Sequence, residues 1–377
     1  MKNKIFILLL MLTLVFSLTS CKRKIKVEDY SISKLSYYMY LDTISTVTVE
    51  YNVHEKTTEE VEKELNYVNN ILLDIEKEFS ISKTYWMTQN NISESTLMKV
   101  NNNSGKSSVK VSDTFLKVLK EAKYIYNLTN QGFDPTIGPI TKLWNIASQA
   151  EYCNEVGFCN VPKDSDILKN LGLIDFNLVK INEEEKTVFL EKEGMMLDFG
   201  GIAKGFAADV VMDYLKPLGY TYISVNLGGN LILYGSSKIY EANNKKVGTE
   251  IQDPNNPSKT IIRTEESNMT LVTSGVYERY IEANGVKYHH ILNPKTGYPF
   301  ENELVMVSII GSNSCICDGL STGVFALGLE DGIKLIKNLE GYSAFFVTKD
   351  NKIYFVGNIE FELTQTGKNN YTLEIVE

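Results

Sequence analysis

Helix-like and strand-like patterns follow one another along this chain in an irregular order, and that order constrains the fold more than any other feature. Apolar residues spaced three and four apart predict amphipathic helices over residues 57–79 and from Ser112-Asp113 to about Leu128. Runs rich in β-branched and aromatic residues predict strands at 37–51 and 222–227. Because the pattern lacks regular βαβ units, it favours an α+β fold over a doubly wound sheet.

Weaker patterns fill the rest of the chain. Residues 82–105 are rich in Asn and Ser and predict a loop, and residues 132–144 predict an irregular segment. The other expected elements are a helix at 164–171, a hairpin over 180–197, a helix at 203–215, a strand at 230–234, strands from 246 to 310, a helix beginning near Asp318 and strands from 342 to 376. With no internal repeat and no compositional break, we expect one folded domain over 37–377.

The N-terminus has the pattern of an export signal. Lys2 and Lys4 precede a nearly uninterrupted apolar run over residues 5–18, which is too short for a permanent membrane helix and matches a signal peptide. The run ends in Leu18-Thr19-Ser20-Cys21, which resembles the bacterial lipobox; an ordinary secretory signal is the alternative. We therefore expect a signal peptide at 1–20, a lipidated (palmitate-bearing) Cys21, a polar tether over 21–36 and anchoring on the extracytoplasmic face of the cell membrane.

Charge and cysteine content narrow the possible partners. The formal net charge of −9 argues against a nucleic-acid partner, because no excess of basic residues is left to neutralise phosphates. Cys153 and Cys159 could close a small disulfide, which an extracytoplasmic location permits. Cys315 and Cys317 lie in an apolar run and are expected to be buried thiols. None of these four cysteines has zinc-site spacing with a histidine.

A first candidate site lies at residues 196–205, where a strand runs into Gly200-Gly201 and then a helix with Lys204 in its first turn. Glycines let backbone N–H groups approach a ligand, a helix N-terminus carries partial positive charge, and the lysine adds a full one. The segment therefore suits an anion such as a phosphate. An ordinary strand–glycine–helix turn is the alternative.

A second candidate site is formed by Asp318 and Thr322, which are four residues apart at the start of an expected helix. Their oxygens would lie on one helix face, and a carboxylate with a hydroxyl is a ligand set that Mg²⁺ accepts. The alternative is that Asp318 only caps the helix.

Three further segments combine polar side chains with turns. His289-His290 precedes the Pro- and Gly-containing turns at 294–299, and either histidine could instead be a hydrogen-bonded residue at the end of a strand. Thr273-Ser274-Gly275 follows an apolar strand, and residues 132–136 place Gly132, Phe133 and Asp134 on an irregular loop.

Taken in order, these segments resemble the FAD:protein FMN transferases, the ApbE-type flavin transferases. The resemblance spans roughly residues 37 to 360. It rests on Ser93-Glu94 with Asn101; residues 132–139 with Trp144; residues 198–205 with Asp209; residues 226–230; residues 251–254; residues 273–275 with 277–279; residues 290–294 with Thr296-Gly297; and residues 318–322. Each piece is weak alone, and the ordered set is specific. The resemblance implies an ApbE-like (T-fold related) single domain with mainly antiparallel sheets and packed helices.

Carried over residue by residue, the resemblance implies three magnesium ligands: Asp318, Thr322 and the carbonyl of Gly201. The residues that it implies along the FAD are Leu41, Gly132, Phe133, Asp134, Asp198, Lys204, Thr273, Ser274 and Ile291. Leu41 departs from the methionine that the family has near the flavin, and Cys317 stands where the family usually has alanine. His290 is the implied catalytic base, because an imidazole titrates near working pH.

The implied reaction is a magnesium-dependent transfer of FMN from FAD to a threonine (or serine) hydroxyl of an extracytoplasmic acceptor protein, with release of AMP. Implied acceptors are redox subunits resembling those of Rnf or sodium-pumping NADH:quinone reductase complexes. Two alternatives stay open: a FAD pyrophosphatase that gives FMN and AMP, and a lipoprotein that binds FAD without chemistry.

Overall fold

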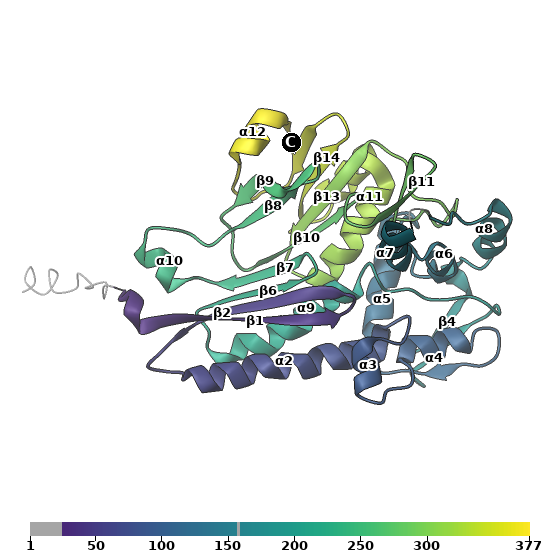
Figure 1. Cartoon of the computed structure of the whole chain (residues 1–377), viewed down its shortest axis with the longest axis horizontal. Helices are drawn as coiled ribbons and strands as arrows, with labels where there is room; N and C mark the ends of the chain where they lie inside the picture. Colours follow the sequence, from purple (N-terminus) through teal and green to yellow (C-terminus); the bar gives the residue numbers. More distant parts are fainter. Residues whose placement is uncertain (1–24, 157–158) are drawn as a thin grey trace, which may run out of the picture.

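The structure is a computed structural model that describes residues 25–156 and 159–377 (Figure 1). The expected signal peptide and the lipidation site at Cys21 lie outside these residues. In the described part of the chain, no helix combines the length and the apolar character that a bilayer crossing requires. A short 3₁₀ helix, Val27–Asp29, leads directly into the first strand.

A nine-stranded sheet forms the centre of the fold, with the order β1-β2-β6-β7-β10-β13-β14-β15-β17. Neighbouring strands are antiparallel except for the parallel pair β15–β17. The strands are β1 Tyr30–Tyr40, β2 Thr43–Asn52, β6 Tyr222–Leu227, β7 Asn230–Gly235, β10 Met269–Gly275, β13 Leu304–Gly311, β14 Ser343–Thr348, β15 Lys352–Val356 and β17 Thr372–Ile375. This arrangement confirms the α+β fold class with mainly antiparallel sheets.

Helices α2 (Thr58–Phe79), α9 (Ala203–Leu215) and α11 (Ser314–Lys337, interrupted at Gly328) cover one face of this sheet (Figure 1). The Thr57 side chain caps α2 in a reciprocal bond with Glu60, which fixes where the helix begins. The stripe of apolar residues predicted for 57–79 is buried, and so the sequence pattern reflects this packing. The other helices are α3 Tyr85–Gln89, α4 Thr96–Asn102, α5 Asp113–Leu128, α6 Gly138–Trp144, α7 Ile146–Val156, α8 Asp164–Leu171, α10 Lys238–Ala242 and α12 Gln365–Asn370.

Smaller sheets complete the structure. The sheet β16-β9-β8 (Phe361–Leu363, Asn256–Thr264 and Thr249–Asp253) places Ile251, Ile261 and Ile262 in one buried apolar cluster with residues of β10, β13 and β14. The others are β3-β5-β4 (Val109–Lys110, Thr187–Leu190 and Val179–Asn182) and the hairpin β11-β12 (Tyr280–Ala283 and Val286–His289). The hairpin β11-β12 leads into His290.

The structure corrects several boundaries expected from the sequence. Strand β1 begins at Tyr30, inside the tether predicted for 21–36, because antiparallel pairing with β2 supplies hydrogen-bond partners from Tyr30 onward. The segments 82–105 and 132–144 contain helices α3, α4 and α6. These helices are too short to show a periodic pattern, and side-chain caps at Thr84 and Ser95 define the first two.

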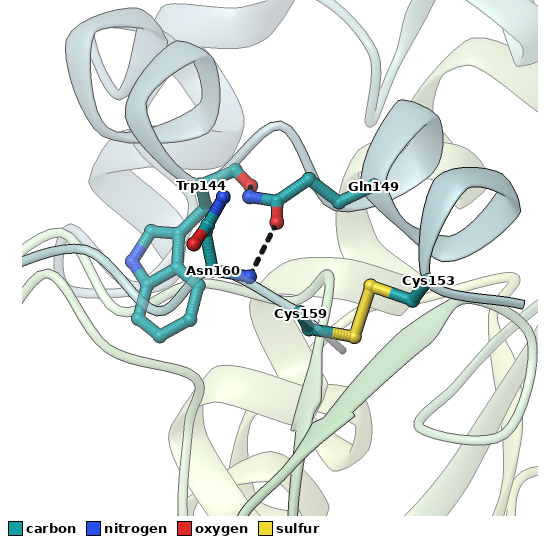
Figure 2. The surroundings of a disulfide bond; sticks show 5 residues. All are labelled: Trp144, Gln149, Cys153, Cys159 and Asn160. Carbon is teal, nitrogen blue, oxygen red and sulfur yellow. Dashed lines mark hydrogen bonds between the residues drawn. A yellow bond between two sulfur atoms is a disulfide. The ribbon is translucent and has the colours of Figure 1, made fainter. Parts of the chain in front are cut away.

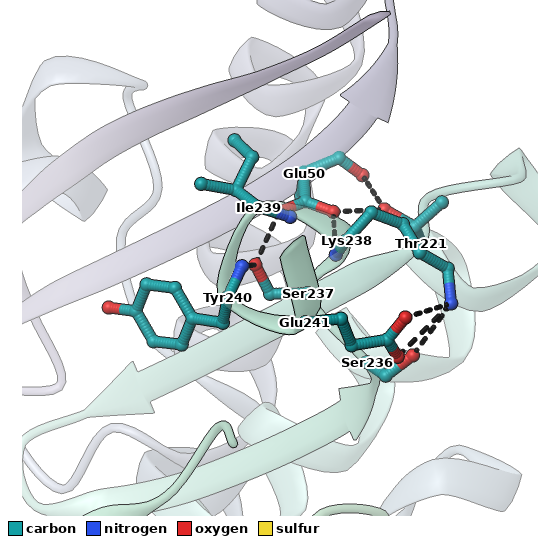
Figure 3. A network of polar contacts seen from close by, with 8 residues as sticks. All are labelled: Glu50, Thr221, Ser236, Ser237, Lys238, Ile239, Tyr240 and Glu241. Carbon is teal, nitrogen blue, oxygen red and sulfur yellow. Dashed lines mark hydrogen bonds and ion pairs between the residues drawn. The ribbon is translucent and has the colours of Figure 1, made fainter. Parts of the chain in front are cut away.

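The buried side chain of Glu50, near the end of β2, binds the segment after β7 (Figure 3). Glu50 is fully buried and accepts hydrogen bonds from the Ser237 hydroxyl at 2.5 Å and the Lys238 amide at 2.6 Å. The Thr221 hydroxyl and the Ile239 amide also donate to it. A carboxyl group at this depth is tolerated only when its oxygens are hydrogen-bonded in this way, so we interpret Glu50 as structural.

Helix α7 is held to the following chain by a Cys153–Cys159 disulfide (Figure 2). Beside it, the Gln149 side chain donates to the Trp144 carbonyl and accepts from the Asn160 amide. Trp144 belongs to the same apolar cluster as Leu292, and its indole donates to the Gly297 carbonyl at 2.7 Å. This region therefore supports the turns that follow His290. The thiols of Cys315 and Cys317 are free and buried, as expected.

Candidate active site

The N-terminal turns of α9 and α11 meet at the centre of the candidate site. Lys204 Nζ lies 3.8 Å from Asp318 Oδ1, and the Gly205 amide donates to Asp318 Oδ2 at 2.9 Å. The helices approach this closely because Gly205 has no side chain: a Cβ there would lie 2.2 Å from the Ser314 carbonyl oxygen. Two segments more than a hundred positions apart in the sequence thus place a lysine beside a carboxylate.

Asp318 is held by its neighbours on one oxygen and left available on the other. Its Oδ2 accepts from the Gly205 amide and from the Asn230 side chain, both at 2.9 Å. Oδ1 faces Lys204 at 3.8 Å, beyond hydrogen-bond distance, although the side chain is only 5% exposed. The helix begins at Ser314 with Asn313 as its cap, so Asp318 lies in the second turn and the alternative of a helix cap is wrong.

Hydroxyl groups surround the next turn of α11. Ser274 Oγ lies 2.7 Å from Ser321 Oγ and 3.4 Å from Thr322 Oγ1. A Cβ on Gly201 would lie 3.4 Å from Thr322 Oγ1 and 3.2 Å from the Phe133 ring, so the Gly200-Gly201 turn packs directly on this part of α11. The structure therefore brings Gly201, Ser274, Thr322 and Phe133 together.

Asp318, Thr322 and the Gly201 carbonyl supply oxygen atoms of the kinds that magnesium accepts. A carboxylate, a hydroxyl and a backbone carbonyl are hard ligands, and Mg²⁺ typically takes one or two carboxylates and completes its shell with water and substrate phosphates. Across residues 25–156 and 159–377, no group of three or more His, Cys, Asp or Glu side chains could hold a metal. Magnesium bound with a phosphate ligand needs no such group.

Asp198 organises the glycine turn in front of Lys204. Its carboxylate accepts from the Gly200 amide at 2.8 Å and from the Thr141 hydroxyl at 2.7 Å. The preceding residue, Leu197, is held through both its amide and its carbonyl by the Asn101 side chain. Lys204 Nζ in turn donates to the Gly200 carbonyl at 3.1 Å, so this turn and the lysine are fixed together.

Residues 132–134 run along α11 beside this turn. A Cβ on Gly132 would lie 2.8 Å from the Ala326 side chain, which shows how closely the loop follows the helix. The Phe133 side chain is buried. Asp134 accepts from both the amide and the hydroxyl of Thr136, and its burial raises its pKa. These contacts give Asp134 a role in the turn; its predicted contact with FAD stays a prediction.

The two adjacent histidines have different surroundings. His289 Nε2 lies 2.9 Å from the Phe300 carbonyl oxygen, and its Nδ1 accepts from the Ile291 amide, so backbone groups occupy both ring nitrogens. His290 Nδ1 lies 3.2 Å from the Arg279 carbonyl oxygen. A carbonyl can only accept, so Nδ1 carries the proton and Nε2 is left as the acceptor of the neutral ring. Of the two residues, only His290 can serve as a base.

Burial lowers the pKa of His290 to about 4, partly opposed by the bond to the Arg279 carbonyl. The positive charges of Arg279 and Lys204 lower it further, as does His289 when that ring is protonated. At neutral pH the ring is therefore uncharged and able to accept a proton.

The turn between β1 and β2 borders the same region. Leu41 and Asp42 both have left-handed backbone angles, and the Asp42 carbonyl accepts from Arg279 Nη2 at 3.1 Å. The Leu41 amide donates to the Glu76 carboxylate at 3.1 Å. Thr43 packs on Gly228, where a Cβ would lie 2.5 Å from the Thr43 hydroxyl. Leu41 is thus attached to the site through Arg279.

The remaining predicted residues are less directly placed. Thr273 Oγ1 lies 2.8 Å from Ser308 Oγ, so this hydroxyl is engaged on the neighbouring strand β13. Ile291 is buried and its amide binds His289. Within the described part of the chain, no hydrogen bond or ion pair joins either residue to Asp318 or Lys204.

Three neighbours of the site, Asn230, Glu278 and Arg279, were not singled out from the sequence. Glu278 is solvent-exposed. Burial raises its pKa to about 7, Lys204 and Arg279 lower it, and Asp318 raises it further. Asn230 lies in the segment 226–230, and Glu278 and Arg279 lie in the segment 277–279. Both segments are part of the family resemblance, which is the signal that could have identified these residues.

Comparisons with known proteins identify the family and the fold. The model of the ApbE family matches residues 41–346. A FAD:protein FMN transferase of Klebsiella pneumoniae is 35% identical over 264 residues, covering 70% of this chain and 78% of that protein. One from Treponema pallidum is 30% identical over 345 residues, covering 89% and 88%. The flavin transferase ApbE from Vibrio cholerae has the same fold, with a TM-score of 0.70 at 22% identity, covering 90% of this chain and 99% of that one. The apbe protein of Thermotoga maritima also gives 0.70, at 24% identity with the same coverage.

Proposed function

This chain belongs to the ApbE family, and from that premise we propose that it transfers FMN from FAD to a threonine or serine hydroxyl of an acceptor protein. Magnesium is the proposed metal and AMP the proposed second product. The chain is a transferase, as its curated relatives are. The observation that carries the proposal is the pairing of Lys204 with Asp318 at the start of two helices.

The first task of the site is to hold a diphosphate. Lys204 supplies a full positive charge, and the glycine turn at 200–201 exposes backbone next to the start of α9. Asp318, Thr322 and the Gly201 carbonyl would hold Mg²⁺, which would neutralise charge on the diphosphate. Asn230 and the Gly205 amide fix the Asp318 carboxylate, so that the other oxygen faces Lys204.

The second task is to activate the hydroxyl. In this proposal the acceptor oxygen attacks the phosphorus of the FMN half, and its proton passes to Nε2 of His290. The bond between that phosphorus and the oxygen bridging to the AMP half then breaks, and AMP leaves with the bridging oxygen. The Arg279 carbonyl keeps the proton of the neutral ring on Nδ1, which leaves Nε2 as the accepting atom.

Hydrolysis of FAD is the second candidate, because solvent reaches the site: the Lys204 side chain is 24% exposed and Glu278 is exposed. Water would then replace the acceptor hydroxyl and give FMN and AMP. The third reading is a flavin-binding lipoprotein without chemistry. The Lys204–Asp318 pair and an unprotonated imidazole at His290 argue against it.

One incubation separates these readings. The purified protein is mixed with FAD, Mg²⁺ and an acceptor protein that carries a target threonine, and the products are analysed by mass spectrometry and chromatography. Transfer predicts covalent FMN on the acceptor with one AMP for each FMN. Hydrolysis predicts free FMN and AMP, and simple binding predicts neither. An acceptor with valine in place of the threonine is the matched control.

We also propose that Cys21 is lipidated and anchors the enzyme on the extracytoplasmic face of the cell membrane. The lipobox-like Leu18-Thr19-Ser20-Cys21 after an apolar run supports this. Acceptors would then be extracytoplasmic redox subunits resembling those of Rnf or sodium-pumping NADH:quinone reductase complexes. Cells fed labelled palmitate should label the wild-type protein and not Cys21→Ser; equal labelling of both would overturn the anchor.

A further inference from the structure

We propose that Arg279 is a positioning residue for the proposed transfer, because it joins the turn at Leu41-Asp42 to the proposed base His290. The kinetic effect that we expect from this proposal rests on the proposed function. The contacts of Arg279 are structural facts independent of that function.

One contact is made by the side chain. Arg279 Nη2 donates to the Asp42 carbonyl at 3.1 Å, a bond between residues 237 positions apart. The turn that it holds has left-handed angles at both Leu41 and Asp42, which are unfavourable for residues other than glycine. A guanidinium bound to its carbonyl stabilises the turn in this conformation.

The other contact is made by the backbone. The Arg279 carbonyl oxygen accepts from the His290 amide at 3.1 Å and lies 3.2 Å from His290 Nδ1. It therefore sets both the position of the His290 backbone and the tautomer of its ring. Since the side chain of the same residue is anchored on Asp42, movement of the β1–β2 turn and movement of the base are coupled through one residue.

The charge of Arg279 acts on the same ring. The cationic groups that act on His290 are Arg279 and Lys204, and His289 adds to them when it is protonated; each of them disfavours protonation of the His290 imidazole. Removing the guanidinium should therefore raise the pKa of His290 as well as loosen its position. A residue that only stabilised the fold would produce no such shift.

The experiment compares Arg279→Met, Arg279→Lys and a matched control, Arg263→Met, on the full chain. Arg263 lies on β9, where its guanidinium pairs with Glu250 and Glu265. The measurements are the pKa of His290 by NMR, the Kd for FAD, and kcat and KM for the acceptor. NMR and FAD binding need no acceptor.

For Arg279→Met we expect a raised His290 pKa, kcat lowered about tenfold to a hundredfold through misplacement of the base, and a FAD Kd within about twofold of wild type. Arg279→Lys keeps the charge without the planar donor pair, so its His290 pKa should stay near wild type and its kcat should be intermediate. Arg263→Met should leave all values unchanged.

The proposal is overturned if either the His290 pKa or kcat of Arg279→Met equals that of Arg263→Met. It is also overturned if kcat stays constant and the Kd for FAD rises by the same factor by which kcat/KM falls. Arg279 would then bind FAD rather than position the base. If the wild-type protein transfers no FMN, the proposed function fails, and the NMR comparison still decides whether Arg279 acts on His290.

Discussion

The amide nitrogen of Gly205 lies 2.9 Å from Oδ2 of Asp318, so the first turn of α9 donates a hydrogen bond to a carboxylate on the second turn of α11. The preceding residue is Lys204, whose Nζ lies 3.8 Å from Oδ1 of the same carboxylate. The Lys204–Asp318 pair thus depends on a close approach of α9 and α11, in which a backbone amide of one helix bonds a side chain of the other.

The first prediction concerns the glycine that allows this approach. In Gly205→Ala the new Cβ would lie 2.2 Å from the Ser314 carbonyl oxygen and 2.7 Å from Asp318 Cβ, so the helices must separate. We expect a loss of about 1–3 kcal/mol in the free energy of unfolding, and weaker FAD binding. Gly172→Ala, where the nearest atom is 3.7 Å away, is the control and should be nearly neutral in urea unfolding. Equal stability of the two variants would contradict the packing described.

The second prediction concerns magnesium. Asp318→Asn keeps the shape of the side chain and removes the negative charge that the ion requires. We expect FAD binding by wild type to tighten as Mg²⁺ is added, and that response to disappear in the variant. Asp331→Asn, an exposed position on the same helix, should respond like wild type. Fluorescence titration of FAD with and without Mg²⁺ measures both, and an unchanged response in Asp318→Asn would rule out this ligand.

The third prediction separates binding from chemistry. His290→Ala should bind FAD with nearly wild-type affinity and lose transfer by about a hundredfold to ten-thousandfold, the range typical for removal of a general base. His54→Ala is the control, because His54 is exposed and paired with Asp29 on another part of the surface. Single-turnover formation of covalent flavin is the measurement. Undiminished transfer by His290→Ala would end the role assigned to this imidazole.

The fourth prediction is a pH dependence. The pKa of His290 is lowered to about 4, so the base is neutral above that pH and the acid limb of kcat/KM should fall well below the ordinary histidine value of about 6.5. The unfolded chain binds the proton more readily than the folded chain, so this group lowers the free energy of unfolding as the pH falls from about 6.5 toward 4. NMR titration of the ring checks the value, and a midpoint at or above about 6.5 would disprove it.

The fifth prediction concerns the disulfide. Replacing Cys153 and Cys159 by serine frees a short loop and should lower the free energy of unfolding by about 2 kcal/mol, according to the chain-entropy relation. The double variant Cys315→Ser/Cys317→Ser does not test the same feature, because those thiols are buried and unpaired. The suitable comparison is therefore wild type with and without reductant. Reductant should destabilise the wild-type protein and leave the Cys153→Ser/Cys159→Ser variant unchanged.

Long helices could be predicted from the sequence because burial of one helix face requires apolar residues at regular spacing. Helices α2, α5, α8 and α9 begin and end within one residue of the expected bounds. The short helices α3, α4 and α6 were missed because helices of five to seven residues are defined by capping and tertiary packing, which leave no periodic apolar pattern. The start of β1 was missed because an edge strand takes its order from its partner β2.

In the candidate site, too, some features could be predicted from the sequence and others depend on tertiary contacts. The Lys204–Asp318 pairing was expected from the family resemblance, and the structure brings the two side chains together. The separate surroundings of His289 and His290 could not be predicted, because they depend on which backbone carbonyls, Phe300 or Arg279, lie beside each ring. The contact of Arg279 with Asp42 likewise joins residues whose separation in sequence leaves no local pattern.

The central claim is that Lys204 and Asp318 act on one diphosphate, and a double-mutant cycle on FAD affinity tests it most directly. The Kd for FAD in the presence of Mg²⁺ is measured for wild type, Lys204→Met, Asp318→Asn and the double variant. We predict that each single change weakens binding and that the double variant loses less than the sum, with a coupling of about 0.5 kcal/mol or more. Losses that add to within about 0.3 kcal/mol would show that the two side chains act independently, and would contradict the account.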